Sequence, residues 1–238
     1  MDREQKEAVW AAIIALAITS LPWIVFIVDG IFALHLKQYG MEPLTVSRLY
    51  GIFTMPFLHD DFDHLMSNTP SLFLLTFGLF LFYDRKAWSM LFNLYIISGI
   101  TVWFMGREGT VHVGASGLIY AMAAFHFLSG LLRKVPRQMA FALLVAFLYG
   151  GFVWAFFPEI YKFTNISWEG HLSGLLTGIA LAFHYRRFGP PMPPDPFVDE
   201  EEDADFEAER LRIEDVIRKV DEKKQSTNYL KKTCPPSK

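Results

Sequence analysis

Long apolar runs separated by short charged segments constrain this 238-residue chain more than any other feature. A helix needs about 20 apolar residues to cross a hydrocarbon core of about 30 Å, because each residue advances it by about 1.5 Å. Six runs are close to this length: residues 8–28, 65–83, 88–105, 115–132, 139–157 and 168–185. Because a helix satisfies its own backbone polar groups in lipid, the pattern predicts an all-α membrane protein with six transmembrane helices.

Basic residues in the connections predict the orientation of these spans. One side carries Arg3, Lys6, Arg85, Lys86, Arg133, Lys134, Arg137, Arg186 and Arg187, whereas the other carries Lys37, Arg48, Arg107 and Lys162. Cytoplasmic connections are enriched in Lys and Arg, so we expect both termini in the cytoplasm of a bacterial inner (plasma) membrane. The first run exceeds the apolar core of about 7–15 residues found in a secretory signal, and we expect it to remain as a span.

The composition changes abruptly after the sixth run. Residues 1–187 are expected to form the membrane domain, and residues 188–238 a cytoplasmic tail. This tail begins with a Pro-rich linker and continues with an acidic segment, residues 199–205. Apolar residues then recur at helical spacing: Ile213, Val216, Ile217 and Val220. The spacing predicts a short amphipathic helix.

Three polar residues fall at one depth in three of the predicted spans. Counted at about 1.5 Å per residue from the inner end of its span, Ser116 rises about 24 Å, His171 about 21 Å and Asn68 about 22 Å. A polar group within lipid is costly unless it meets a partner or a wet cavity, so we expect these three to share one pocket near the outer surface. His126 and His184 lie too close to the inner surface to reach Ser116.

The surroundings of Ser116 and His171 suit a nucleophile and its base. Glycines flank both residues: Gly114 and Gly117 around Ser116, and Gly170 and Gly174 around His171. Small residues let two helices approach closely, which a proton transfer between serine and histidine across about 3 Å requires. Taken alone, either motif favours the plainer interpretation of a helix-packing site.

Three further side chains belong to this hypothesis. His64 and Asn68 are four residues apart on one helical face, where they are candidate donors to an oxyanion. Taken alone, this pair favours the plainer interpretation of a helix cap and a buried amide. Tyr120 lies one turn below Ser116, where it is placed to stack on the imidazole of His171. His112 is a weaker candidate base, because a loop histidine with local hydrogen bonds explains it more simply.

The combination of these motifs is far more specific than any one of them. The chain contains Phe57-Leu58-His59, His64-x-x-x-Asn68, Gly114-Ala115-Ser116-Gly117 with Tyr120, and Gly170-His171-x-x-Gly174-x-x-x-Gly178. In order, spacing and assignment to helices, it resembles the rhomboid family of intramembrane serine proteases over roughly residues 8–187. The resemblance implies a six-helix rhomboid-like bundle.

The resemblance also implies roles for individual residues. Ser116 would be the nucleophile and His171 the general base, while His64, Asn68 and the Ser116 amide would form the oxyanion hole. Tyr120 would pack against His171, and His59 would be structural. Substrate entry would be gated by residues 147–157 and 158–167. This sequence departs from many relatives in its first outer connection, where Arg48-Leu49 replaces a Trp-Arg pair.

These observations predict an intramembrane serine endopeptidase that cuts a transmembrane protein substrate in or near its membrane segment. The alternative is a catalytically inactive relative that binds membrane proteins without cutting them. A transporter is disfavoured because no charged residue lies in the interior of a span. A zinc protease would need a His-Glu-x-x-His pair, which the sequence lacks, so we expect no metal and no cofactor. The lipid bilayer is the expected surrounding, no nucleic acid partner is expected, and the oligomeric state stays open.

Overall fold

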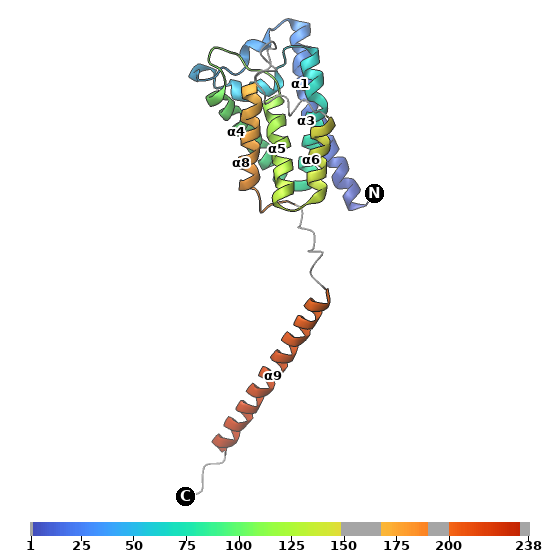
Figure 1. Cartoon of the computed structure of the whole chain (residues 1–238), viewed down its shortest axis with the longest axis vertical. Coiled ribbons are helices and arrows are strands. Elements are labelled where there is room, and N and C mark those ends of the chain that lie inside the picture. The colour runs from blue at the N-terminus through green and yellow to red at the C-terminus, as the bar shows by residue number, and fades with distance from the viewer. Residues whose placement is uncertain (1, 149–167, 190–199, 234–238) are drawn as a thin grey trace. The chain divides into compact units, whose positions relative to one another are not determined.

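The computed structural model describes residues 2–148, 168–189 and 200–233. The chain divides into two compact units, Met1–Met192 and Pro193–Lys238, which we describe separately. Every regular element within the described ranges is helical, as Figure 1 shows, and one isolated antiparallel bridge joins Met41 to His112. The all-α class expected from the apolar runs is therefore confirmed.

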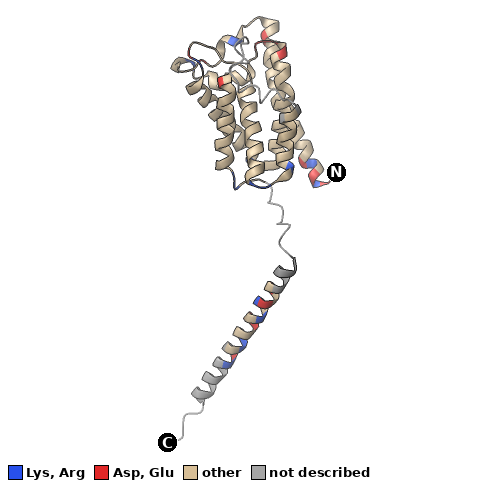
Figure 2. Cartoon of the chain, viewed as in Figure 1, with Lys and Arg blue, Asp and Glu red and all other residues tan. Residues whose placement is uncertain are grey.

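Three helices of the first unit are long and apolar enough to cross a membrane: α1 (Arg3–Phe32), α3 (Phe62–Tyr83) and α4 (Lys86–Met105). Aspartates cap two of them, because the Asp2 carboxylate accepts a hydrogen bond from the Gln5 amide and that of Asp61 accepts one from the His64 amide. Charged residues gather at the ends of the bundle and leave the helix centres apolar (Figure 2). This is the distribution that a surrounding bilayer requires.

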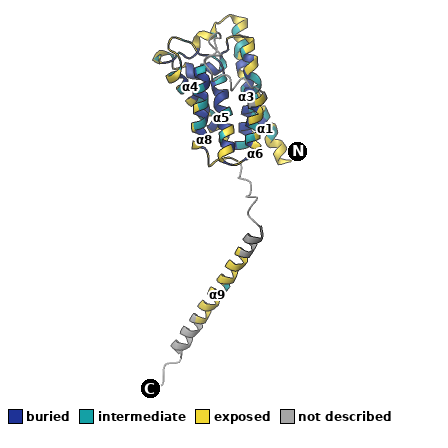
Figure 3. Ribbon diagram, in the orientation of Figure 1, coloured by how far each residue is buried: buried dark blue, intermediate teal, exposed yellow. Residues whose placement is uncertain are grey.

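The centre of the bundle is α5 (Ser116–Leu132), a shorter apolar helix. It packs against α3 and α4, and also against α6 (Pro136–Leu148) and α8 (Trp168–His184). Figure 3 shows α5 largely buried, whereas exposed residues line the outer faces of its neighbours. The innermost side chains include Leu75, Leu79, Met90, Leu94, Met122 and Phe125. The fifth predicted span, residues 139–157, continues past the described residues, so the number of six spans stays a prediction.

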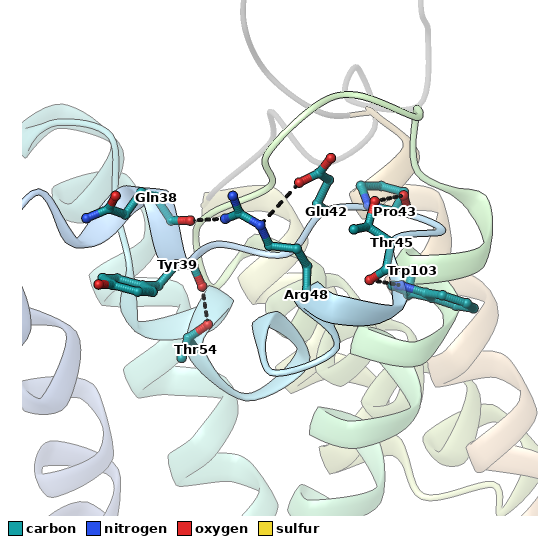
Figure 4. A network of polar contacts seen from close by, with 8 residues as sticks. All are labelled: Gln38, Tyr39, Glu42, Pro43, Thr45, Arg48, Thr54 and Trp103. Atoms are coloured by element: carbon teal, nitrogen blue, oxygen red, sulfur yellow. Dashed lines mark hydrogen bonds and ion pairs between the residues drawn. The ribbon is translucent and has the colours of Figure 1, made fainter.

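The outer connection between α1 and α3 is an ordered set of short helical turns. They are η1 (Leu36–Tyr39), η2 (Val46–Arg48), α2 (Gly51–Thr54) and η3 (Met55–Phe57). Figure 4 shows that Arg48 ties η2 to η1, since its guanidinium donates to the Gln38 carbonyl and pairs with the Glu42 carboxylate at 3.4 Å, while the Thr54 hydroxyl of α2 donates to the Tyr39 carbonyl. The Trp103 indole of α4 donates to the Thr45 carbonyl at 3.4 Å. Arg48 thus orders this connection without a preceding tryptophan.

The second unit contains α9 (Glu200–Thr233), which is longer than the short helix expected from the apolar spacing. It begins at Glu200, within the acidic segment of the sequence. Local ion pairs such as Arg218–Asp215 and Lys219–Asp215 lie along its surface. Its apolar residues Ile213, Val216, Ile217 and Val220 are exposed.

Candidate active site

Ser116 is the first residue of α5 and follows a tight turn. The turn depends on Gly114, whose φ of +106° lies in the left-handed region that other residues rarely adopt. The Gly114 amide donates to the Met55 carbonyl at 2.9 Å, which ties the turn to η3. Ser116 is half-buried, and its backbone N–H belongs to the free donors of a helix start. A hydroxyl and a helix-start N–H, the kind of donor that can bind an anion, therefore come from one residue.

His171 lies in the first turn of α8, and its imidazole stacks on the Tyr120 ring of α5. The ring centroids are 4.2 Å apart and the planes differ by 14°. Both residues are buried. Since Tyr120 is one turn below Ser116 on the same helix, the stack places the histidine beside the serine-bearing helix. The expected contact between Tyr120 and His171 is present.

Close approach of α5 and α8 depends on glycines in α8. A Cβ atom at Gly174 would overlap the Gly117 carbonyl oxygen and lie 2.9 Å from the Tyr120 Cβ. A Cβ at Gly178 would overlap the Ala121 carbonyl oxygen in the same way. On the other helix, a Cβ at Gly117 would lie 3.4 Å from the Gly170 carbonyl oxygen, which is ordinary contact. The two backbones thus touch directly next to Ser116 and His171.

His64 and Asn68 of α3 reach the turn before Ser116. A Cβ at Gly114 would lie 2.7 Å from His64 Nε2 and 3.6 Å from Asn68 Nδ2, so both side chains face this glycine. His64 and Asn68 therefore lie at the helix start that carries the Ser116 amide. Donors from two elements converge there, as an oxyanion site requires.

His59 orients the amide of Asn68. The Asn68 Nδ2 group can only donate, and it lies 3.1 Å from His59 Nε2, which must therefore accept. Burial, with a smaller contribution from the neighbouring His64, lowers the pKa of His59 to about 4 and keeps this acceptor unprotonated at neutral pH. One N–H of Asn68 is used in this way, which leaves the other for a ligand. This geometry fits the structural role expected for His59.

His112 makes local contacts in the connection between α4 and α5. Its backbone pairs with that of Met41 at 2.7 and 2.9 Å. The Thr110 hydroxyl donates to the Arg107 carbonyl at 2.6 Å, so it accepts a hydrogen bond from His112 Nε2 at 2.9 Å. These bonds match a histidine that stabilises a loop.

An ion pair at the outer end of α8 was missed by the sequence reasoning. Arg107 donates from Nη2 at 3.0 Å and from Nε at 3.2 Å to Glu169 Oε1. Glu169 stands two residues before His171, and its side chain is only 8% exposed. The opposite charges of Arg107 and Glu169 are visible in the sequence, but that they meet follows only from the structure, which packs α4 against α8.

The described residues place the expected site residues in one connected cluster. Within the part of the chain that the structure describes, Ser116 and His171 are not hydrogen-bonded to each other. Hydrogen bonds between catalytic groups commonly tighten only when substrate is bound. Among the described residues, no group of three or more His, Cys, Asp or Glu side chains is arranged to hold a metal ion. The expected gate comprises residues 147–157 and 158–167. Apart from residues 147 and 148, it lies outside the described residues.

Known proteins share the part of the chain that carries this cluster. Residues 46–188 match the Rhomboid domain. Uncharacterized proteins of Mycobacterium bovis and Mycobacterium tuberculosis are each 33% identical over 174 residues, which covers 71% of this chain and 72% of each relative. An uncharacterized protein of Mycobacterium leprae is 30% identical over 174 residues, covering 71% of this chain and 68% of the relative.

Proposed function

Because this chain belongs to the rhomboid family, whose members are generally intramembrane serine proteases, we propose that it hydrolyses peptide bonds with a Ser116–His171 dyad. The observation that carries the proposal is the stack of Tyr120 on His171 at 4.2 Å, one helical turn from Ser116. A stacked imidazole in a buried site has a fixed plane. A general base needs such an orientation before it can take a proton.

The proposed reaction has two steps. The Ser116 hydroxyl attacks the carbonyl carbon of the scissile bond and gives its proton to His171, which passes it to the leaving amine. Water then attacks the acyl-enzyme, gives a proton to His171 and releases the acid while the Ser116 hydroxyl is restored. Water reaches the site from the outer side, since hydrocarbon excludes it.

The proposed dyad works without a catalytic carboxylate, because the sequence places no Asp or Glu at the right depth to orient His171. The stacking of Tyr120 takes the place of the aspartate in a triad. A triad aspartate fixes the tautomer of its histidine and stabilises the imidazolium. We therefore expect slow turnover relative to triad proteases.

In the proposed oxyanion hole, His64, Asn68 and the Ser116 amide stabilise the negative charge of the tetrahedral intermediate. Asn68→Ala is expected to lower kcat by about 10²–10³-fold, as loss of one such donor does in soluble proteases. KM should change little, because the interaction forms only in the transition state. Steady-state cleavage of a single-pass model substrate measures both constants. Asn93→Ala is the matched control, because it removes a half-buried amide that donates to the Tyr185 hydroxyl away from the candidate site. An Asn68→Ala protein with wild-type kcat would remove Asn68 from the oxyanion hole.

The experiment that tests the dyad is covalent labelling by a fluorophosphonate probe. Wild-type protein should label at Ser116, because the probe reports a serine activated by a base. His171→Ala should remain folded and show no labelling above background, since it keeps the hydroxyl but loses the base. Equal labelling of the two proteins would contradict the proposal.

A catalytically inactive, membrane-protein-binding relative is the competing function. Both Ser116 and His171 are present here, which favours the enzyme. An inactive relative would bind a transmembrane segment but leave Ser116 unlabelled, so the same experiment separates the two functions.

We further propose a topology and a substrate class. Both termini lie in the cytoplasm of a bacterial inner membrane, and residues 1–187 form six spans with residues 188–238 as a cytoplasmic tail. The substrate is a transmembrane protein cut in or near its membrane segment, with entry gated by residues 147–167. No cofactor is required by this chemistry.

A further inference from the structure

In the first turn of α8, Glu169 and His171 lie on opposite sides of the helix. Each residue turns a helix by about 100°, so Glu169 points about 200° away from His171 around the helix axis. His171 faces Tyr120 of α5, whereas Glu169 meets Arg107 just past the end of α4. The outer end of α8 is therefore held from two opposite sides.

Burial makes the contact with Arg107 important for Glu169. The carboxylate side chain is 8% exposed, whereas that of Arg107 is 65% exposed. A buried carboxylate is costly unless it is paired, and two guanidinium nitrogens supply hydrogen bonds to the same oxygen, Oε1. The negative charge in the first turn also complements the helix dipole. Glu169 therefore has a strong preference for the orientation that meets Arg107.

Arg107 is itself fixed to the segment that carries the nucleophile. It starts the connection between α4 and α5, and its carbonyl accepts hydrogen bonds from the hydroxyl and the amide of Thr110. The Thr110 hydroxyl is hydrogen-bonded to the His112 imidazole, and the His112 backbone is hydrogen-bonded to that of Met41. The same connection ends at Ser116. The ion pair thus links the serine-bearing segment to the histidine-bearing helix by a route separate from the glycine contacts.

We propose that the Arg107–Glu169 ion pair fixes the rotation of α8 and thereby aims the His171 imidazole at Ser116. Glu169 and Arg107 are positioning residues in this role, because they act through His171. The role rests on the proposed protease function. The glycine contacts with α5 set the distance between the helices, and the ion pair sets the angle of α8 about its own axis.

The test compares Glu169→Gln, Arg107→Gln, the double variant and Arg107→Lys in the full chain. For each, kcat, KM, the rate of fluorophosphonate labelling of Ser116 and the melting temperature are measured. Arg3→Gln is the matched control, because it breaks an arginine–glutamate pair of 2.8 Å that lies within α1. It should leave all four quantities at wild-type values.

Each single glutamine variant should lower kcat and the labelling rate about tenfold, which corresponds to a coupling of about 1.4 kcal/mol. KM should stay near wild type, because the substrate site is intact. Arg107→Gln takes the guanidinium away from a buried carboxylate and should lower the melting temperature, whereas Glu169→Gln removes the charge itself and should lower it less. The double variant should lose no more kcat than the less active of the two single variants, since both changes remove the same interaction. Arg107→Lys keeps the charge and should lose less than about threefold.

Several results would overturn the inference. These are single variants with wild-type kcat, a double variant with the product of the two single losses, and a Glu169→Gln variant whose kcat falls only at temperatures where it unfolds. If Glu169→Gln does not fold, the pair Arg107→Gln and Arg107→Lys decides, because the Arg107 side chain is largely exposed. Wild-type protein that neither cleaves nor labels would instead refute the proposed function. An active wild type with equally active variants would refute the ion-pair role alone.

Discussion

Ser116→Ala is expected to abolish cleavage of a transmembrane substrate, with a fall in kcat of about 10⁶-fold. The magnitude follows soluble serine proteases, in which loss of the nucleophile removes covalent catalysis and leaves only binding and the oxyanion hole. Ser116 is half-buried at a helix start, so removing one oxygen leaves the packing of α5 intact. The measurement is single-turnover cleavage of a model substrate in proteoliposomes, with circular dichroism and melting temperature as checks on folding.

Ser98→Ala is the matched control for this variant. The Ser98 hydroxyl is buried in α4 and donates to the Tyr95 carbonyl of its own helix at 3.1 Å. Its loss should leave kcat within about twofold of wild type, since one local hydrogen bond contributes about 1 kcal/mol to folding and nothing to the chemistry. Continued cleavage by a purified Ser116→Ala protein would show that another group is the nucleophile.

Enlarging Gly174 should also lower kcat strongly, although this residue takes no part in the chemistry. Gly174→Ala is expected to lower kcat about 10²-fold, because displacement of a catalytic group by about 1 Å has an effect of this size. Gly174→Leu requires a larger separation of α5 and α8, and should lower kcat by about 10⁴-fold or more. The added atoms also overpack the interface, which lowers the free energy of unfolding by about 1–3 kcal/mol. Cleavage rates and thermal unfolding of the two variants test this series.

Gly30 provides the comparison for the glycine series. It lies in α1, and a Cβ atom there would meet nothing within 4 Å. Gly30→Ala and Gly30→Leu should therefore keep wild-type kcat and melting temperature, or gain slightly in stability from better helix propensity. If Gly174→Leu cleaved as fast as Gly30→Leu, the close approach of α5 and α8 would not be needed to bring His171 to Ser116.

Much of the site could be predicted because depth in a membrane is nearly one-dimensional. Counting residues along each apolar run predicts that Ser116, His171 and Asn68 lie at one level. The structure brings Asn68 to the turn before Ser116 and stacks Tyr120 on His171. The spacing of Gly170, Gly174 and Gly178 indicated the helix face that meets α5, because residues four apart share a face.

Other features depend on contacts that no local pattern records. Arg107 and Glu169 are 62 residues apart, and their pairing requires the ends of α4 and α8 to be neighbours. The outer connection takes its conformation from bonds between distant residues, such as the Trp103 indole with the Thr45 carbonyl. The sequence predicts a short helix after the acidic segment, but helix propagation is cooperative, and α9 begins within that segment.

The contact between α5 and α8 has a consequence for how this protein can change over evolutionary time. What faces Gly174 and Gly178 is the main chain of the opposite helix, through the carbonyl oxygens of Gly117 and Ala121. A clash with a side chain can be relieved by shrinking that side chain, but every amino acid carries the same carbonyl. A substitution in α5 therefore cannot make room for a larger residue at position 174 or 178. We expect glycine to be retained at both positions as the sequence diverges.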